Sequence, residues 1–300
     1  ILADRGELDL HAPVARYWPE FAAEGKEAIE VRHLMGHTAG LSGWQEPMEE
    51  ADLYDWEKAT ARLAAQAPWW EPGTASGYHA LTQGYLVGEV VRRVSGQTVG
   101  AFFASEVAGP LGADFHIGTG PEHDARVAKV IPPPSLIERM DGADPNGIAM
   151  RTFVNPMLRA EASWDEEWRR AEIPAAGGHG NARSVARVQS IVACGGEVGG
   201  HRFLSEAGCE AIFERQAEGT DLVLGVPLTL GMGYGLSSKL TPLSPNPRTC
   251  YWGGWGGSVV ICDLDARLCI AYVMNRMGEG TVGDDRGLGI VLATYMAVLG

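Results

Sequence analysis

The spacing of the apolar residues changes near the end of this chain, and the change limits which folds are open to it. Apolar residues recur at helical spacing in three segments, 54–66, 86–96 and 184–194. Residues 258–263 and 268–274 are instead two short apolar runs separated by a polar turn, as in a hairpin of buried strands. Residues 288–299 return to helical spacing and can cover such a sheet. Helices followed by a hairpin and a covering helix predict an α+β fold.

The same pattern divides the chain into two regions. We expect a mainly helical region at residues 1–205 and an α/β region, with the hairpin and the C-terminal helix, at residues 206–300. Residues 109–172 contain a run of three prolines and few periodic apolar residues, which predicts long surface loops. Residues 1–6 resemble the last turns of a helix closed by a glycine, so we expect further chain before Ile1.

Charge and composition exclude two kinds of interaction. The chain has 24 Lys and Arg against 38 Asp and Glu, a formal charge of −14, which repels polyanions. With 45% hydrophobic and 21% charged residues, it has the composition of a folded globular protein. Its longest apolar runs are shorter than the roughly 18 to 20 residues that span a bilayer. We therefore expect no nucleic-acid partner and no membrane span.

The cysteines and histidines lack the spacing of metal sites. The five cysteines form no C-x-x-C pair, and we expect them to be reduced and mostly buried. His33 and His37 have no H-E-x-x-H frame, and we expect them to cap and pack a short helix at 31–35. The sequence therefore predicts neither a metal nor a cofactor. Reduced cysteines favour a cytoplasmic location.

Residues 251–258 combine four glycines with two tryptophans at the head of the hairpin. The residues of interest are Trp252, Gly253, Gly254 and Trp255. Glycines in such a position weaken a strand unless something approaches the backbone closely, and a ligand is one candidate. A twisted strand packed under aromatic rings is the other, and this pattern alone does not separate them.

A second motif lies on the loop at residues 72–80. This loop brings Tyr78 and His79 to the start of a helix. A tyrosine on a loop is more often a packing residue than a catalytic one. In this order, however, residues 31–41, the Tyr78 loop and the glycine-rich hairpin resemble the serine β-lactamase and penicillin-binding-protein-like superfamily. The resemblance is to its class C-like esterase branch, the family VIII carboxylesterases, and it covers nearly the whole chain.

The resemblance implies an antiparallel sheet flanked by helices, a helical region, and N-terminal strands that lie outside this chain. It also implies three motifs, of which the first, Ser-x-x-Lys, is absent from residues 1–300. We therefore expect the nucleophilic serine and its lysine before Ile1. A homologue that lacks a nucleophile remains the alternative.

The second family motif, Tyr-x-Asn, corresponds to Tyr78, His79 and Ala80, so the amide of the family is missing here. The resemblance implies that Tyr78 accepts the serine proton and returns it to the leaving group. A protonated lysine beside it would lower its pKa from about 10. His79 is a candidate substrate contact or a bystander.

The third family motif corresponds to Trp252, Gly253 and Gly254, where a tryptophan replaces a cation. An indole offers an apolar face and one N–H donor, so selection for an anionic β-lactam should weaken. The backbone N–H of Trp255 is expected to form half of an oxyanion hole.

These expectations define the function predicted from the sequence. The protein is expected to be a serine hydrolase that cleaves a small-molecule ester, or an amide, through an acyl-enzyme. The alternatives are a β-lactamase, a DD-peptidase, an acyltransferase, or a non-catalytic binding homologue. The oligomeric state does not follow from the sequence.

Overall fold

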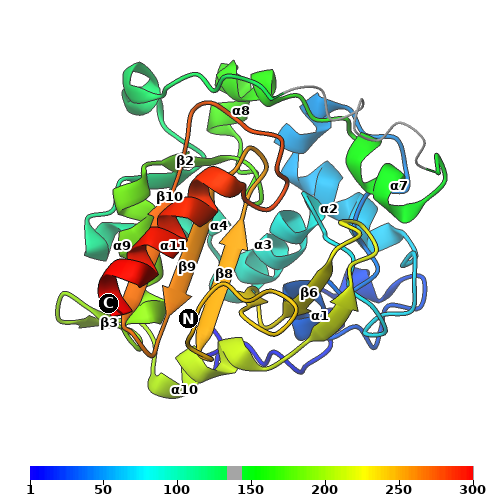
Figure 1. The fold of residues 1–300 in the computed structure, drawn as a ribbon. Helices are drawn as coiled ribbons and strands as arrows, with labels where there is room; N and C mark the ends of the chain where they lie inside the picture. The colour runs from blue at the N-terminus through cyan, green and yellow to red at the C-terminus, as the bar shows by residue number, and fades with distance from the viewer. Residues whose placement is uncertain (134–143, 300) are drawn as a thin grey trace.

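The structure is a computed structural model that describes residues 1–133 and 144–299 (Figure 1). Its centre is a six-stranded sheet with the strand order β10-β9-β8-β7-β6-β5, in which all neighbours are antiparallel. The strands are β5 (Ala217–Thr220), β6 (Pro227–Leu230), β7 (Gly235–Leu236), β8 (Thr249–Gly253), β9 (Val259–Asp263) and β10 (Leu268–Tyr272). The hairpin predicted from the two apolar runs is present as β9 and β10, and helices with an antiparallel sheet agree with the α+β prediction.

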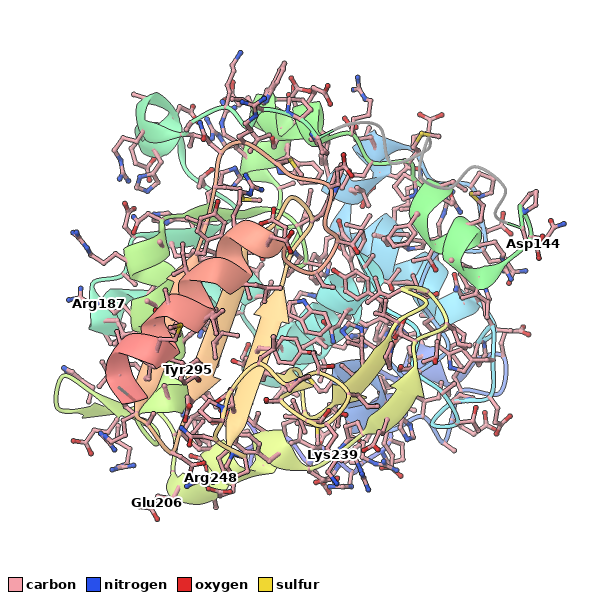
Figure 2. The ribbon with its side chains drawn as sticks, viewed as in Figure 1. Asp144, Arg187, Glu206, Lys239, Arg248 and Tyr295 are labelled. Carbon is pink, nitrogen blue, oxygen red and sulfur yellow. The ribbon has the colours of Figure 1, made fainter. Side chains whose placement is uncertain are left out.

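Successive side chains of a strand point to opposite sides, so this sheet has buried side chains on both faces. Helices cover both faces. On one face, Tyr251 and Ile261 pack against Val291 and Tyr295 of helix α11 (Asp285–Leu299), which crosses in front of β9 and β10 in Figure 1. The hydroxyl of Tyr295, labelled in Figure 2, donates a hydrogen bond of 2.8 Å to the carboxylate of Asp263.

The other face of the sheet lies against α9 (Ala182–Ala193) and α10 (Glu206–Glu210). Cys250 and Cys262 pair across β8 and β9 and pack against Val192 of α9. The hydroxyl of Ser205 accepts a hydrogen bond from the N–H of Gly208, as expected for the N-cap of α10.

The helical part of the molecule has its own core. Its helices are α1 (Val31–Met35), α2 (Trp56–Ala65), α3 (Thr82–Ser95) and α4 (Val99–Phe103). Its buried side chains come from α1, α2, α3, the segments between them and the segment before α1, and include Trp18, Phe21, Leu34, Trp44, Leu63 and Leu86. The helix predicted at 86–96 ends where Gly96 adopts φ +73°, a left-handed conformation that glycine accepts without strain.

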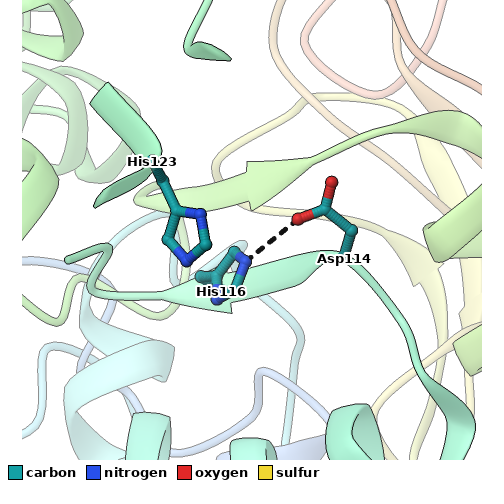
Figure 3. A group of neighbouring side chains, drawn as sticks. All are labelled: Asp114, His116 and His123. Carbon is teal, nitrogen blue, oxygen red and sulfur yellow. Dashed lines mark hydrogen bonds and ion pairs between the residues drawn. The ribbon is translucent and has the colours of Figure 1, made fainter. Parts of the chain in front are cut away.

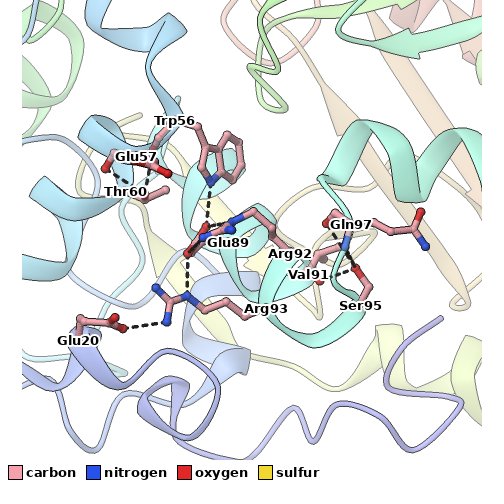
Figure 4. Close-up of polar contacts among 10 residues, drawn as sticks. All are labelled: Glu20, Trp56, Glu57, Thr60, Glu89, Val91, Arg92, Arg93, Ser95 and Gln97. Atoms are coloured by element: carbon pink, nitrogen blue, oxygen red, sulfur yellow. Dashed lines mark hydrogen bonds and ion pairs between the residues drawn. The ribbon is translucent and has the colours of Figure 1, made fainter.

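A buried carboxylate joins three segments of this core (Figure 4). The side chain of Glu89 on α3 is 1% exposed and accepts hydrogen bonds from the indole of Trp56 and from Arg92 and Arg93. Arg93 also donates to Glu20 at 2.8 Å. The network fixes α3 against α2 and against the segment that precedes α1.

The prediction of long loops over residues 109–172 is wrong for much of this stretch. Short elements occupy it: α5 (Gly109–Leu111), β1 (Phe115–Ile117), η5 (Pro121–Arg126), α7 (Ile148–Val154), η6 (Ala160–Trp164) and α8 (Glu166–Arg170). Elements of three to seven residues are too short to show a period, and β1 forms only by pairing with the distant β2 (Gly178–Gly180). The part of the prediction that falls on residues 134–143 lies outside the described residues.

The remaining elements are short. They are η1 (Val14–Arg16), η2 (Pro19–Ala22), η3 (Glu50–Tyr54), the π-helix η4 (Ala104–Ala108), β3 (Glu197–Val198), β4 (His201–Arg202) and η7 (Ala211–Phe213). Over residues 1–133 and 144–299, none of the helices has the length and apolar character needed to cross a membrane. The division of the chain at residue 205 stays a prediction.

Candidate active site

The first wall of the candidate site is the loop that follows α1. The helix begins with the predicted cap, in which the ring of His33 accepts the N–H of Glu30. After α1 ends, His37 adopts φ +57° and is 4% exposed, so its ring is buried on a backbone conformation that side chains usually avoid. Gly40 follows at φ +76°, where a Cβ atom would lie 2.6 Å from the carbonyl oxygen of Trp70.

The Tyr78 loop lies directly against this first loop. The N–H of Gly77 donates to the carbonyl of His37 at 3.0 Å, and the N–H of His79 donates to Nδ1 of His37 at 3.1 Å. These bonds hold the backbone on both sides of Tyr78. Tyr78 therefore lies just before α3, as predicted, with its main chain fixed against the end of α1.

His79 is an interior residue with 0% exposure. Its Nε2 accepts the N–H of Leu41 at 3.1 Å, which assigns the ring proton to Nδ1, and Nδ1 lies 2.6 Å from the carbonyl oxygen of Gly77. Burial lowers its pKa to about 4, so the ring is neutral at pH 7. Both nitrogens are bonded to main-chain groups, and a contact between His79 and a substrate stays a prediction.

Three aromatic rings meet where these loops reach the sheet. The ring of Tyr78 lies with its centroid 5.7 Å from that of Trp252 on β8, and the two planes are tilted by 52°. The ring of His37 stacks on Trp252 and meets Tyr78 edge-on, with centroids 5.3 and 5.4 Å apart. The fold thus brings together the two motif residues that the sequence separates most widely.

The strand after Trp252 is shaped by its glycines. A Cβ atom on Gly253 would lie 2.4 Å from the carbonyl carbon of Val282, so no side chain fits there. The chain then turns, and the N–H of Gly254 donates to the carbonyl of Ser258 at 2.9 Å. Among the described residues, the N–H of Trp255 has no hydrogen-bond acceptor, as an oxyanion-hole donor requires.

The environment of Tyr78 favours its protonated form. Burial, and secondly the charge of Asp221, raise the pKa of Tyr78 to about 12. The lowered pKa that the resemblance implies would need a cation beside the phenol, and the described residues supply none that acts on Tyr78. That part of the expectation stays a prediction.

A family model named Beta-lactamase matches residues 1–294 of the chain. The chain belongs to the β-lactamase family. The chain is similar to the esterase/β-lactamase LipL of Mycobacterium tuberculosis. The two are 36% identical over 288 residues, which are 92% of this chain and 65% of LipL. The chain therefore spans slightly less than two thirds of the length of this relative.

Solved structures agree with the assignment to the β-lactamase family. The crystal structure of a family VIII carboxylesterase has a TM-score of 0.90 and 42% identity, over 98% of this chain and 78% of that chain. A penicillin-binding-protein homologue from Caulobacter crescentus has a TM-score of 0.87 and 35% identity, over 99% of this chain and 78% of that chain. The family and fold that the motifs predict are confirmed.

Sequence reasoning missed two residues of this site. His37 was expected only to cap and pack its helix, yet its ring contacts those of both Tyr78 and Trp252. Asp221 was not singled out, yet its Oδ1 accepts the N–H of Tyr78 at 3.0 Å. His37 belongs to residues 31–41, one of the stretches that carry the family resemblance, and this was a signal for its role. No local pattern marks Asp221.

One group of side chains outside this site has the composition of a metal site (Figure 3). His116 Nε2 lies 3.2 Å from Asp114 Oδ1, and the ring of His123 lies beside that of His116. Arg126, however, donates two hydrogen bonds of 2.6 and 2.9 Å to Asp114 and one of 2.8 Å to His123. Its guanidinium uses the lone pairs that a metal would need, so we assign no metal here.

Proposed function

We propose that this protein is a serine hydrolase that cleaves carboxylic esters through an acyl-enzyme. The contact between the rings of Tyr78 and Trp252 is the observation that carries the proposal. It brings a group able to transfer a proton against the strand that leads to Trp255, whose main-chain N–H has no acceptor among the described residues and which we propose as the oxyanion donor. The similarity to LipL and to a family VIII carboxylesterase supports the same function.

The proposed reaction transfers the acyl group twice, first from the ester to a serine and then from the serine to water. A serine oxygen attacks the ester carbonyl, and Tyr78 accepts the serine proton and returns it to the leaving alcohol. Water then attacks the acyl-serine, which releases the carboxylic acid and restores the serine. The N–H of Trp255 stabilises the oxyanion of both steps, a contact commonly worth about 2.7 to 4 kcal/mol. The proposal requires a serine and a lysine that the family resemblance implies before Ile1.

An ester is the proposed substrate because of the residue at 252. Trp252 presents an aromatic face where related β-lactamases and peptidases are expected to present a cation, so a substrate carboxylate gains little from this strand. The space where a side chain of Gly253 would lie is filled by the main chain of Val282, and we propose that an acyl group lies against the main chain of Gly253 and Gly254 on another side. A small molecule of this kind needs no nucleic-acid or membrane partner.

The test uses the complete gene product, including any residues before Ile1, with a p-nitrophenyl ester and with nitrocefin. Tyr78→Phe is expected to lower ester turnover by about 10²- to 10⁴-fold, because the proton shuttle is lost. Tyr54→Phe is the matched control, since burial also raises the pKa of Tyr54 to about 12 but this residue packs in the helical core. Unchanged ester turnover in Tyr78→Phe would discard the proposal.

Three further outcomes separate the alternatives. Rapid nitrocefin turnover without ester turnover would favour a β-lactamase, and product formation only with an added alcohol would favour an acyltransferase. The absence of any acyl-serine by mass spectrometry after incubation with the ester would favour a binding homologue.

We also propose a cytoplasmic location. All five cysteines are free thiols, although Cys250, Cys262 and Cys269 stand side by side on neighbouring strands. Fractionation of cells that express the complete gene checks this, and recovery of the protein outside the cytoplasm would overturn it.

A further inference from the structure

A buried carboxylate holds the loop of Tyr78 from the sheet side. Asp221 follows β5, is 1% exposed and accepts three main-chain N–H groups at Oδ1. Two of them belong to its own turn, Val223 and Leu224, both at 2.9 Å. The third is the N–H of Tyr78 at 3.0 Å. One side-chain oxygen thus closes its own turn and binds the main chain of the proposed proton shuttle.

A second contact fastens the same two loops. The N–H of Leu222 donates to the carbonyl of Ser76 at 2.8 Å, two residues before Tyr78. The turn of Asp221 is itself closed by a bond of 3.0 Å from its N–H to the carbonyl of Val226. Asp221 therefore lies in a turn closed by its own hydrogen bonds, and the position of this turn fixes the main chain of Tyr78.

The other oxygen of Asp221 is left without a partner. Oδ2 is buried from solvent and has no hydrogen-bond donor among the described residues, and none of their ion pairs includes Asp221. A buried carboxylate oxygen without a donor is costly, so such groups call for an explanation other than stability. Here the carboxylate binds the main chain of Tyr78, and its charge is the second cause, after burial, of the raised pKa of the phenol.

Within the described part of the chain, Asp221 is the one charge that acts on the phenol of Tyr78. His37 faces Tyr78 from the loop after α1, and His79 is its neighbour on the Tyr78 loop. Strand β8 contributes the uncharged ring of Trp252. Burial lowers the pKa of both histidines, so both are neutral at pH 7. A negative charge close to a phenol favours its protonated form.

We propose that Asp221 is a positioning residue for Tyr78, whose main chain it holds in place from the sheet side. This inference rests on the proposed function, in which the phenol must give up and regain a proton. The proposal has a second, electrostatic half: a cation that ionises Tyr78 at neutral pH must offset both the burial of the phenol and the negative charge of Asp221.

The electrostatic half is tested with 3-fluorotyrosine incorporated at residue 78 of the complete protein. The fluorine lowers the phenol pKa and gives a single resonance, whose shift during a pH titration reports the ionisation of this ring alone. Asp221→Asn keeps an oxygen that can accept the three N–H groups and removes the charge. We expect it to lower the pKa of the fluorinated ring, by less than about one unit because burial is the larger cause of the raised pKa.

The control variant removes a different buried aspartate. Asp263 is 0% exposed and is fully bonded to Ser244, Asn246 and Tyr295. We expect Asp263→Asn to leave the pKa of the fluorinated ring unchanged. An unchanged pKa in Asp221→Asn would overturn the electrostatic role.

The positional half is tested by hydrogen exchange at the Tyr78 amide, measured by NMR. We expect Asp221→Ala to speed this exchange at least about tenfold relative to amides of α3, because the acceptor is lost. Asp221→Asn should restore slow exchange. Unchanged exchange in Asp221→Ala would overturn the positional role, and where Asp221→Ala fails to fold, fast exchange in Asp221→Asn would do so.

Both readouts are independent of turnover. They can succeed while Tyr78→Phe retains ester turnover, which would discard the proposed function and leave the link between Asp221 and Tyr78 intact. Conversely, loss of turnover in Tyr78→Phe with both readouts unchanged would retain the hydrolase and discard the role of Asp221.

Discussion

The imidazole of His37 lies stacked on the indole of Trp252, with ring centroids 5.3 Å apart and an angle of 18° between their planes. This contact joins the loop after α1 to strand β8, which are distant in sequence. Tyr78 packs against both rings, so its position depends on the stack. His37 is therefore expected to set the distance between the loop that carries the phenol and the strand that carries Trp255.

Removal of this ring tests that dependence. Asparagine tolerates the left-handed backbone of His37, so His37→Asn deletes the stack with little added strain. We expect ester turnover by the complete protein to fall by about tenfold or more, because a small misplacement of a catalytic group is costly. His11→Asn, at an exposed histidine, serves as the control. Turnover equal to that of the control would contradict the role assigned to His37.

Stability should depend on pH through His79. Its pKa in the folded protein is about 4, against about 6.5 in the unfolded chain, so the unfolded chain binds more protons between these values. The free energy of unfolding is therefore fully retained above pH 6.5 and falls as the pH drops toward 4. At pH 5 we expect His79 to account for a loss of about 2 kcal/mol. Urea titrations at pH 7 and pH 5 measure it.

His79→Gln removes this titration and should make the difference between the two pH values smaller. The exposed His201→Gln is the control and should retain the full difference. A difference that is the same for His79→Gln and the parent protein would exclude His79 as its source.

A cation at residue 252 should change the preference between substrates. We expect Trp252→Lys to raise the ratio of nitrocefin to ester turnover by about tenfold, equivalent to about 1.4 kcal/mol, because an ammonium group attracts the carboxylate of a β-lactam. Trp252→Phe keeps an aromatic ring against His37 and should leave the ratio unchanged. An equal change in both variants would mean that loss of the indole, and not the new charge, is responsible.

The buried Lys26 should contribute to stability. Its ammonium group is 0% exposed and donates to the carbonyls of Ala23 and Ala64, at 2.7 and 2.9 Å, and to that of Gln66. Two of these acceptors, the carbonyls of Ala64 and Gln66, lie at the end of α2. We expect Lys26→Met to lower the free energy of unfolding by about 2 kcal/mol, because the acceptors lose their donor.

Lys58→Met is the matched comparison for Lys26. Lys58 pairs with Asp52 at the surface and is 40% exposed, so its replacement should cost about 1 kcal/mol or less. Urea unfolding of both variants at pH 7 measures the two effects. Equal losses would contradict the assignment of Lys26 as the more important donor.

The elements predicted from sequence are those with local signals. The apolar period and Gly96 marked α3, and the turn between two apolar runs marked β9 and β10. Strands β6 and β7 were missed because they have four residues or fewer and form only by pairing with neighbours in the sheet. The same reason explains the short elements missed between residues 109 and 172.

For the site, the order of the motifs was enough to indicate the family and the residues Tyr78, Trp252 and Trp255. The sequence by itself determined the caps, the helical periods and the hairpin, because each depends on residues a few positions apart. Only the tertiary structure decided that His37 stacks on Trp252 and that Asp221 binds a residue 143 positions away. Such contacts depend on which loops meet in space and on how deeply they are buried, and neither property is encoded in a local pattern.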